Sequence, residues 1–366
     1  MNSNSEKKQT VIIAGGGTGG HIYPGVAVAR AVEVLHPELE VHFVGSTGGL
    51  EETIVPREGF PLHTVSVGRL HSSVGRWTQI KTLIKMPLAF WSAWKILRQL
   101  KPVAVLGVGG FASGPVLLIA SLLGYRTLIW EPNAFPGWTN RILAKRVDEC
   151  LVVFKEAGQH LRARKLTASG VPVRSVMVPA PRLAHPGFFR ILIFGGSQGA
   201  RFINNLVVES LQLGGWIEGV EVVHQTGPAD FAKIKAAYAG IDEKCFQVFE
   251  YLHDMDKRFA WADLVICRSG ASTVAEVCAC EKAAIFIPLP TAADDHQTKN
   301  AQVLAAKNAA LVCRQSELSA QSFRETIARF RDNPELTKNM EENVKQFQFP
   351  NAAEEITRRL LAGAKA

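Results

Sequence analysis

The chain of 366 residues is long enough to form two domains, each with a hydrophobic core of its own. Hydrophobic residues make up 47% of it and charged residues 20%, proportions typical of a globular protein, which exclude a disordered or fibrous chain. The net charge of +8 is unevenly distributed, because residues 57–101 carry eight Lys or Arg residues and a single acidic residue, Glu58.

The six cysteines show no spacing typical of a metal site. Cys278 and Cys280 are separated by one residue, closer than in the usual C-x-x-C pair, and are interpreted as small packing residues. Residues 1–9 are polar and lead directly into an expected strand, so we expect no signal peptide. A reducing, cytoplasmic environment is therefore predicted.

In the first half, short apolar runs alternate with helix-compatible segments. The runs expected to form strands are residues 11–14, 41–44, 103–106, 127–130 and 150–153, and a helix is expected over residues 26–35. Most of these strands run into glycine or proline turns. This alternation of strands and helices is typical of a parallel sheet.

The second half repeats the pattern after a proline-rich stretch, residues 171–187, which we interpret as the connection between domains. Strands are expected at residues 191–194, 220–225, 246–249, 264–267, 284–288 and 310–313, and helices at 202–213, 272–281 and 297–307. The predicted fold class is α/β, with two doubly wound, Rossmann-like parallel-sheet domains facing a cleft. The basic tail, residues 352–366, has a helical pattern that does not decide on which domain it packs.

Two glycine-rich turns of the same design lie about half a chain apart. Residues 15–21 follow the first expected strand, and residues 195–201 follow the first strand of the second half. Each turn joins a strand to a helix, a shape that directs backbone N–H groups and a helix N-terminus at an anion. Two such turns in equivalent positions favour a phosphorylated substrate.

Aromatic residues are interleaved with the cations of residues 57–101. The residues that carry this pattern best are Trp77, Lys85, Trp91 and Trp94. Indoles at headgroup depth and cations near anionic lipid are typical of a protein face that contacts a membrane surface. Charges and Pro87 interrupt the stretch, so we do not expect it to span a bilayer. Some apolar residues must face the core, and nucleic-acid binding is the weaker alternative for a basic surface.

Two polar segments of the second half follow expected strands. Residues 268–276, RSGASTVAE, open a helix, and their small side chains let a ligand approach the backbone. Glu276 could accept two hydrogen bonds from a ribose diol, or it could be a plain carboxylate that complements the helix macrodipole. Residues 294–300, DDHQTKN, group amide and charged side chains that can bind sugar hydroxyls. Their adjacent acidic residues rarely converge on one ion, so no metal site is expected.

Two further candidates lie in the first half. His21 directly follows the first glycine turn and is either a structural histidine or an imidazole that accepts a proton near neutral pH. Residues 109–115, GGFASGP, form another glycine turn next to the basic segment. This turn is either a plain connection or a second phosphate site for an acceptor that carries its own diphosphate.

Seven motifs together resemble one family. GGGTGGHIYPGVAVA, GVGGFASGP, EPNAFPGWTN, SGVPVR, GGSQGAR, RSGASTVAE and DDHQTKNA occur in this order over nearly the whole chain. The chain resembles the MurG family of GT-B glycosyltransferases, which transfer N-acetylglucosamine (GlcNAc) from UDP-GlcNAc to the 4-hydroxyl of undecaprenyl-diphospho-N-acetylmuramyl-pentapeptide in peptidoglycan synthesis. The resemblance implies an inverting reaction that needs no metal or cofactor, at the cytoplasmic face of the bacterial inner membrane. Anionic lipid and other cell-wall synthesis proteins are then candidate partners, and nucleic acid is not.

The resemblance also implies a domain organisation. Residues 1–172 would form an acceptor-binding, membrane-associated domain, and residues 173–349 would bind UDP-GlcNAc. A C-terminal helix at about residues 350–366 is expected to pack back on the first domain.

The matching motifs also imply roles for individual residues. His21 matches a proposed general base. Matches to UDP-GlcNAc contacts are Thr18, Gly19, Gly20, Asn133, Arg174, Ser197, Leu252, Ala271, Ser272, Thr273, Val274, Ala275, Glu276 and Gln297. In this set, Asn133 and Gln297 would bind the sugar, Ser197 the diphosphate, Leu252 the uracil through its backbone, and Glu276 the ribose. Gly110 and Ser113 are acceptor-site candidates, and Trp77, Lys85, Trp91 and Trp94 are candidates for the membrane face.

The chain departs from the family at two places. The family often has H-E-Q-N where this chain has residues 130–133, WEPN, so Trp130 and Pro132 are not expected to have polar roles. Phe111 stands where tyrosine is common, which removes a hydroxyl.

Three other functions share part of the pattern. A nucleotide-sugar 2-epimerase has the same fold and would release UDP-ManNAc. An NAD-dependent oxidoreductase is disfavoured, because neither glycine turn combines G-x-G-x-x-G spacing with a convincing acidic ribose partner about 20 residues later, Glu40 being merely nearby. A non-catalytic membrane adaptor would need neither His21 nor Gln297.

Overall fold

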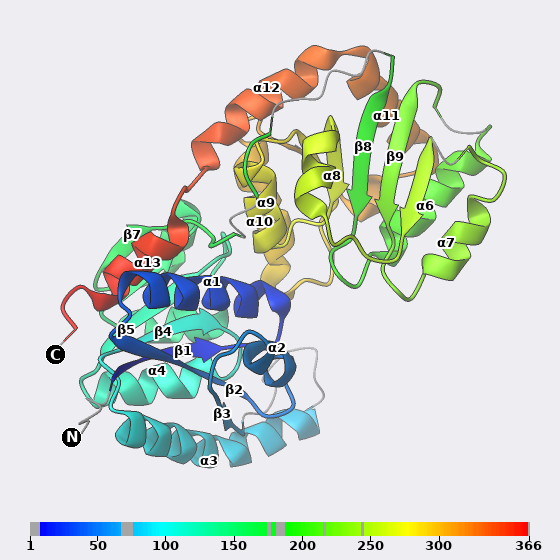
Figure 1. Cartoon of the computed structure of the whole chain (residues 1–366). Helices are drawn as coiled ribbons and strands as arrows, with labels where there is room; N and C mark the ends of the chain where they lie inside the picture. Colours follow the sequence, from blue (N-terminus) through cyan, green and yellow to red (C-terminus); the bar gives the residue numbers. More distant parts are fainter. Residues whose placement is uncertain are drawn as a thin grey trace, which may run out of the picture. The chain divides into compact units, whose positions relative to one another are not determined.

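The structure is a computed structural model that describes residues 8–66, 76–173, 177–180, 187–214, 217–242 and 245–364, and for residues 76–85 the backbone alone. The chain folds into two compact units (Figure 1). The first comprises Met1–Pro172 and Phe349–Ala366, and the second comprises Val173–Gln348. Each contains one parallel sheet with helices, which confirms the predicted α/β fold class.

The first unit is built on a seven-stranded sheet of order β3-β2-β1-β4-β5-β6-β7, in which all neighbouring strands are parallel. Its strands are β1 (Gln9–Gly15), β2 (Leu39–Ser46), β3 (Leu62–Val65), β4 (Ala104–Gly109), β5 (Arg126–Glu131), β6 (Glu149–Val152) and β7 (Leu166–Ala168). The edge strands β3 and β7 were not expected from the sequence. Both are short and only partly buried, so they lack a continuous apolar run.

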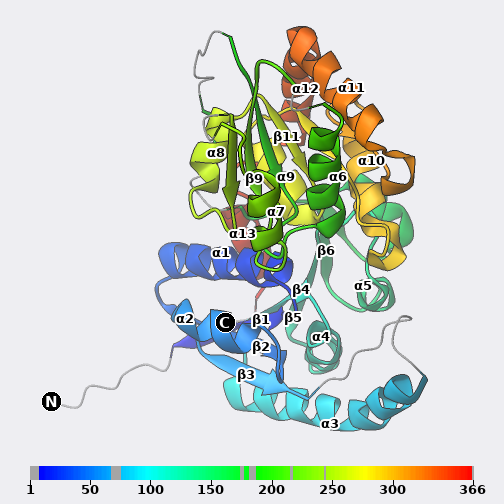
Figure 2. The same cartoon turned by 90° about the vertical axis from the view of Figure 1, so that its right-hand side faces the viewer.

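Helices cover both faces of this sheet. They are α1 (Gly19–Leu35), α2 (Glu51–Arg57), α3 (Arg76–Leu100), α4 (Ser113–Leu122), α5 (Trp138–Leu143), the 3-10 helix η1 (Lys155–His160) and α13 (Ala352–Leu361). In Figures 1 and 2, α1 and α13 lie on one face, and α3 and α4 lie on the other. Helix α1 begins earlier than the sequence predicts, at Gly19, and continues through Pro24. Because proline lacks an N–H group, this costs the helix one hydrogen bond.

The C-terminal helix α13 packs against α1 and the first sheet. Its Ile356 and Leu360 side chains are buried. Arg359 lies 3.5 Å from the buried carboxylate of Glu149 on β6, and its backbone carbonyl accepts a hydrogen bond from Arg126 of β5. The tail of the chain is therefore part of the first unit.

The second unit is built on a six-stranded parallel sheet of order β10-β9-β8-β11-β12-β13. Its strands are β8 (Phe189–Phe194), β9 (Val220–Gln225), β10 (Phe246–Phe249), β11 (Leu264–Cys267), β12 (Ala284–Phe286) and β13 (Leu311–Val312). Its helices are α6 (Arg201–Gln212), α7 (Phe231–Ala237), α8 (Met255–Trp261), α9 (Ala271–Ala279), η2 (Ala293–Asp295), α10 (His296–Ala305), η3 (Gln315–Glu317), α11 (Ala320–Asp332), α12 (Pro334–Val344) and η4 (Lys345–Phe347).

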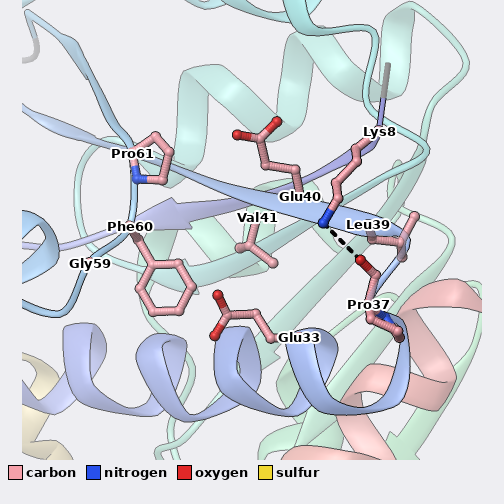
Figure 3. Close-up of a pocket in the computed structure, with 9 residues that line it drawn as sticks. All are labelled: Lys8, Glu33, Pro37, Leu39, Glu40, Val41, Gly59, Phe60 and Pro61. Carbon is pink, nitrogen blue, oxygen red and sulfur yellow. Dashed lines mark hydrogen bonds between the residues drawn. The ribbon is translucent and has the colours of Figure 1, made fainter. Parts of the chain in front are cut away.

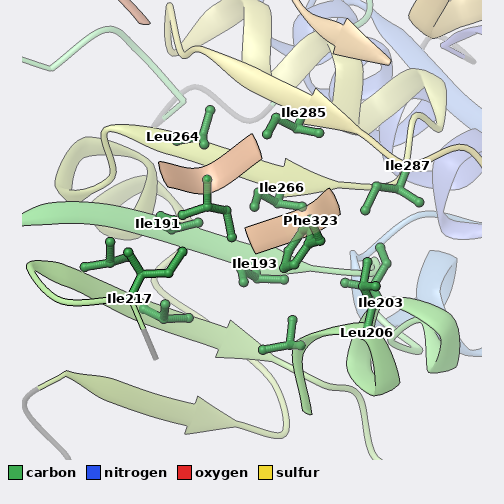
Figure 4. Packing of buried hydrophobic residues seen from close by; sticks show 14 of the residues in the cluster. Ile191, Ile193, Ile203, Leu206, Ile217, Leu264, Ile266, Ile285, Ile287 and Phe323 are labelled. Atoms are coloured by element: carbon green, nitrogen blue, oxygen red, sulfur yellow. The ribbon is translucent and has the colours of Figure 1, made fainter. Parts of the chain in front are cut away.

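A cluster of buried hydrophobic side chains joins this sheet to its helices (Figure 4). Ile191 and Ile193 of β8 point to one face, where they pack with residues of α6 and with Phe323 of α11. Phe194 points to the other face, where its ring meets that of Phe259 in α8. This alternation explains why β8 reads as a continuous apolar run, since both of its faces are covered.

The strand order of each sheet reverses at one position. In the first unit this switch point lies between β1 and β4, and in the second between β8 and β11. Ligands of open parallel sheets bind beyond the carboxyl ends of the strands at such a point. Both predicted glycine turns directly follow these strands, β1 and β8.

Candidate functional sites at the two switch points

Two glycine loops meet at the switch point of the first sheet. The backbone N–H of Gly16, after β1, donates to the carbonyl of Gly109, at the end of β4, over 3.2 Å. A Cβ atom on Gly15 or on Gly110 would overlap the backbone of the opposite loop. Gly110 also has a φ of 84°, which favours glycine. Only glycines allow this close approach.

Two backbone N–H groups of the first glycine turn donate to acceptors within the protein. The N–H of Gly16 is bonded to Gly109, and that of Gly17 donates to the carboxylate of Glu51 over 2.8 Å. The amides of Gly16 and Gly17 are therefore already bonded within the protein. Helix α1 begins at Gly19 with Thr18 as its N-cap, and the first N–H groups of a helix have no acceptor within it. The Gly19 and Gly20 amides remain the candidates for an anion.

His21 lies in the first turn of α1, and its ring packs against Gly109. Its Nδ1 atom is 3.3 Å from both the carbonyl oxygen of Gly16 and the hydroxyl of Thr18. Because a carbonyl oxygen only accepts, Nδ1 carries the proton in that contact. Nε2 then carries the lone pair, which is the tautomer that a proton acceptor at Nε2 requires.

Glu51, the first residue of α2, was not identified from the sequence. Its side chain is 1% exposed, and its carboxylate accepts hydrogen bonds from Gly17 N, Ser46 N and Ser46 Oγ. Burial acts to raise the pKa of Glu51, but these hydrogen bonds outweigh it and hold the pKa below its usual value. An acidic residue at a helix start is common, so the sequence offered no sign of this role.

Asn133 follows β5 in a turn held by the buried carboxylate of Glu131. The backbone and side-chain nitrogens of Asn133 donate to one Glu131 oxygen, and Gly137 N and Asn140 Nδ2 donate to the other. Burial raises the pKa of Glu131, against the effect of these four donors. Since the Asn133 amide nitrogen faces Glu131, its Oδ1 atom is turned away from that carboxylate.

The structure corrects the expectation that Trp130 has no polar role. Its ring is fully buried, and its indole N–H donates to the carbonyl of Gly170 over 3.2 Å. Position 130 therefore has a polar role after all, toward the protein interior, because a buried indole N–H needs an acceptor.

The acceptor candidates after β4 have different surroundings. Ser113 is buried, and its hydroxyl donates to the carbonyl of Gly110 over 2.9 Å, so this side chain holds the turn together. Phe111, between them, is exposed.

Helix α3 has two different faces in its described part. Ala89, Ala93 and Leu97 are fully buried. Outward-facing apolar side chains are Leu88, Trp91 and Trp94, with relative exposures of 60%, 60% and 43%. Lys95 Nζ lies 5.8 Å from the centre of the Trp91 ring, and Arg98 lies at the same distance from Trp94. Trp91 and Trp94 are thus surface residues, whereas the side chains of Trp77 and Lys85 lie outside the described part.

At the switch point of the second sheet, Ser197 lies exposed in the loop after β8. Gln225 supports this loop by donating to the carbonyl of Gly196 over 3.0 Å. A Cβ on Gly199 would overlap the carbonyl of Thr226, so close packing requires glycine there. Arg174, a predicted donor-binding residue, lies outside the described residues.

The N-terminus of α9 lies on the other side of the same switch point. Ala271, Ser272, Thr273 and Ala275 are partly exposed in its first turns, whereas the Val274 side chain is buried. Leu252, after β10, is also buried, so Val274 and Leu252 can offer a ligand only their backbone.

Glu276 is the sixth residue of α9, and the first turn of this helix contains no acidic residue. The macrodipole alternative is therefore weak, since that effect fades beyond the first turn.

Gln297 is the second residue of α10 and is held by the loop after β12. Its Oε1 atom accepts from Leu289 N over 3.0 Å, and its backbone carbonyl accepts from Ser269 Oγ over 2.8 Å. The buried guanidinium of Arg268 donates to the carbonyls of Ile287 and Pro288. These contacts connect the chain after β11 to the chain after β12.

A groove of about 390 Å³ lies elsewhere in the first unit (Figure 3). It is lined by Lys8, Glu33, Pro37, Leu39, Glu40, Val41, Gly59, Phe60 and Pro61. Glu40, near the start of β2, pairs with Thr10, near the start of β1. It therefore lies at the amino ends of the strands, whereas the glycine loops follow their carboxyl ends. Glu40 therefore cannot serve as the acidic ribose partner of a dinucleotide bound at those loops.

Among the described residues, no three or more His, Cys, Asp or Glu side chains are grouped to hold a metal ion. None of the helices in this part of the chain combines the length and apolar character needed to cross a membrane.

Both units match known sequence families. Residues 11–152 match the glycosyltransferase family 28 N-terminal domain, and residues 190–356 match the glycosyltransferase family 28 C-terminal domain. A relative from Bdellovibrio bacteriovorus is 45% identical over 97% of this chain and 99% of its own length. Another, from Myxococcus xanthus, is 42% identical over 94% of this chain and 91% of its own length. Both are named UDP-N-acetylglucosamine–N-acetylmuramyl-(pentapeptide) pyrophosphoryl-undecaprenol N-acetylglucosamine transferase.

Among solved structures, MurG from Acinetobacter baumannii superposes with a TM-score of 0.82 and 31% sequence identity. The match covers 97% of this chain and 99% of that chain.

Proposed function

This chain belongs to glycosyltransferase family 28, within the MurG family, and from that premise we propose that it transfers GlcNAc from UDP-GlcNAc to undecaprenyl-diphospho-N-acetylmuramyl-pentapeptide. The observation that carries the proposal is the 45% identity to a transferase of this name over 97% of the chain. The fold is GT-B, with two Rossmann-like units.

The second unit is the proposed donor site. The loop with Ser197 and the first turn of α9 flank its switch point. Both would offer backbone N–H groups to a diphosphate. Glu276 would accept hydrogen bonds from the ribose hydroxyls. Gln297 would bind the sugar through its side-chain amide nitrogen, since its Oε1 is already held by Leu289. Arg174 and the Leu252 backbone complete the proposed contacts on this side.

The first unit supplies the proposed base and further sugar contacts. His21 would take the proton of the acceptor 4-hydroxyl as its oxygen attacks the anomeric carbon, which inverts that centre. Its Nδ1 contact to Gly16 supports this role, because it leaves the lone pair on Nε2. Thr18, Gly19, Gly20 and Asn133 would contact the donor sugar and diphosphate.

The leaving UDP gains negative charge as the glycosidic bond breaks. Backbone amides fixed in position stabilise such charge without reorganisation. The Ser197 loop and the N-terminus of α9 would therefore perform the task that a cation performs in metal-dependent transferases.

The outer face of α3 is the proposed membrane-contacting surface. Leu88, Trp91 and Trp94 expose apolar area beside Lys95 and Arg98, an arrangement suited to anionic lipid. We propose peripheral attachment at the cytoplasmic face of the bacterial inner membrane, where the lipid-linked acceptor is found. Gly110 and Ser113 would shape the acceptor side of the loops.

Product analysis tests the proposed reaction against its rivals. The purified protein is incubated with UDP-GlcNAc alone, or together with the lipid-linked muramyl acceptor, in the presence and absence of EDTA. We expect UDP and a disaccharide lipid only when the acceptor is present, at the same rate with EDTA. UDP-ManNAc formed without the acceptor would identify a 2-epimerase instead.

A further inference from the structure

One peptide group of the first glycine loop makes hydrogen bonds in two directions. It joins Gly16 to Gly17. Its N–H donates to Glu51 Oε2 over 2.8 Å, and its carbonyl oxygen lies 3.3 Å from His21 Nδ1. A carboxylate, a peptide group and an imidazole therefore lie in one row of hydrogen bonds.

The carboxylate of this row is held firmly. Its other oxygen accepts from both the backbone N–H and the hydroxyl of Ser46, over 2.7 and 2.6 Å. A Cβ atom on Gly16, Gly45 or Gly49 would overlap the Glu51 side chain. Three glycines from two segments thus leave room for one buried carboxylate behind the loop.

We propose that Glu51 is a positioning residue for His21, acting through the Gly16–Gly17 peptide group. Hydrogen bonds in a row polarise one another, so an N–H bonded to a carboxylate makes the carbonyl of the same peptide a stronger acceptor. That carbonyl then holds the proton of His21 on Nδ1 and fixes the plane of the ring. A carboxylate that orients a catalytic histidine directly has the same effect in serine proteases. The inference rests on the proposed role of His21 as the base.

The first part of the proposal is tested by determining which ring nitrogen of His21 carries the proton. This measurement does not depend on enzymatic activity. The full-length protein is labelled with ¹⁵N-histidine, and His21 is assigned by comparison with His21→Gln. In the neutral ring, we expect the proton on Nδ1 and an unprotonated Nε2. A proton found on Nε2 would overturn the proposal, and this result needs no variant of Glu51.

Glu51→Gln tests the second part, with Glu52→Gln as its matched control. Glu52 is the next residue and is exposed, and its carboxylate accepts a hydrogen bond from Gly48 N over 3.0 Å. It therefore lies at the start of the same helix but takes no part in the row of hydrogen bonds that leads to His21. In Glu51→Gln, one of the donors must face an amide NH2 group, and we expect His21 to become a mixture of both tautomers. We also expect a kcat roughly tenfold lower, about 1.4 kcal/mol of barrier, with less change in the KM for UDP-GlcNAc. Glu52→Gln should change neither.

The outcomes separate this inference from the proposed reaction. If the wild-type protein transfers no GlcNAc, the proposed function fails, and the ring nitrogens still report on Glu51. If Glu51→Gln is folded by circular dichroism and keeps the wild-type His21 spectrum, the inference is overturned even where activity falls. Should Glu51→Gln not fold, Glu51→Asp replaces it. Its shorter side chain cannot hold Gly17 and Ser46 together, so the same loss of the Nδ1 tautomer is expected, and an unchanged spectrum contradicts the proposal.

Discussion

His224 and Asn204 form a buried hydrogen bond in the second unit, where the Nε2 atom of His224 lies 3.0 Å from Asn204 Oδ1 and neither side chain is exposed. The amide nitrogen of Asn204 donates to Thr226 and Asp230, so its oxygen is the acceptor and Nε2 of His224 is the donor. Nδ1 then accepts from the hydroxyl of Tyr238 over 2.6 Å. This network has no place for a second proton on the imidazole.

The network predicts a pH dependence of stability. Burial lowers the pKa of His224 to about 3, whereas an unfolded histidine has a pKa of about 6.5. The unfolded state therefore binds the extra proton first, and stability is lost as pH falls below about 6.5. Each pH unit costs about 1.4 kcal/mol, so this residue should lower the free energy of unfolding by about 2 kcal/mol between pH 7 and pH 5.

Thermal melts of the wild type and His224→Gln over this range measure the effect. The variant starts from a lower melting temperature and should show a shallower decline with pH, because glutamine does not titrate. Parallel declines would show that His224 is not the group responsible.

Removal of the ribose carboxylate should affect binding more than turnover. We expect Glu276→Ala to raise the KM for UDP-GlcNAc roughly 10-fold or more, the scale of a lost hydrogen bond to a charged group, with kcat little changed. The contact is made alike in the ground and transition states. Calorimetric titration with UDP provides the check, and Glu209→Ala, an exposed carboxylate on α6, is the control. Unchanged donor affinity would remove Glu276 from the site.

Removal of the proposed base should have the opposite signature. We expect His21→Ala to lower kcat roughly 100-fold or more, the usual scale for general-base loss, while UDP-GlcNAc still binds. His36→Ala is a matched control, because this partly exposed histidine directly follows the same helix. A variant with an unaltered circular dichroism spectrum and near-normal turnover would make His21 a structural residue.

The exposed tryptophans of α3 should govern attachment to lipid. Replacing Trp91 and Trp94 with serine is expected to weaken binding to anionic vesicles while activity on a short-chain, soluble acceptor survives. Each nearby cation adds about 1 kcal/mol of attraction, a part that added salt should screen.

A matched control replaces the exposed Val34 and Leu35, at the end of α1, with serine. That pair should leave co-sedimentation with vesicles unchanged. If the tryptophan variant is well folded and sediments like the wild type, the outer face of α3 does not contact the membrane.

The sequence predicted the strands best where both faces are covered. Residues 191–194 form a continuous apolar run because helices cover both faces of β8. The edge strand β7 is three residues long and exposes Leu166, so it carries no such run.

Within the candidate sites, the sequence indicated the loops but not their internal contacts. Glycine turns are visible as local patterns, whereas the burial of Glu51 depends on three glycines from two segments. The indole bond of Trp130 likewise depends on Gly170, which lies 40 residues further along the chain. Contacts of this kind arise only in the folded structure.

Transfer of radiolabelled GlcNAc into the lipid phase tests whether this protein is the proposed GlcNAc transferase. The purified protein is given UDP-[¹⁴C]GlcNAc with undecaprenyl-diphospho-N-acetylmuramyl-pentapeptide, or with undecaprenyl phosphate, which lacks the acceptor sugar. We expect label in the lipid fraction with the muramyl acceptor only, and one UDP released for each GlcNAc transferred. Label that stays in the aqueous phase with both lipids, from a folded protein that binds UDP-GlcNAc, would contradict this expectation.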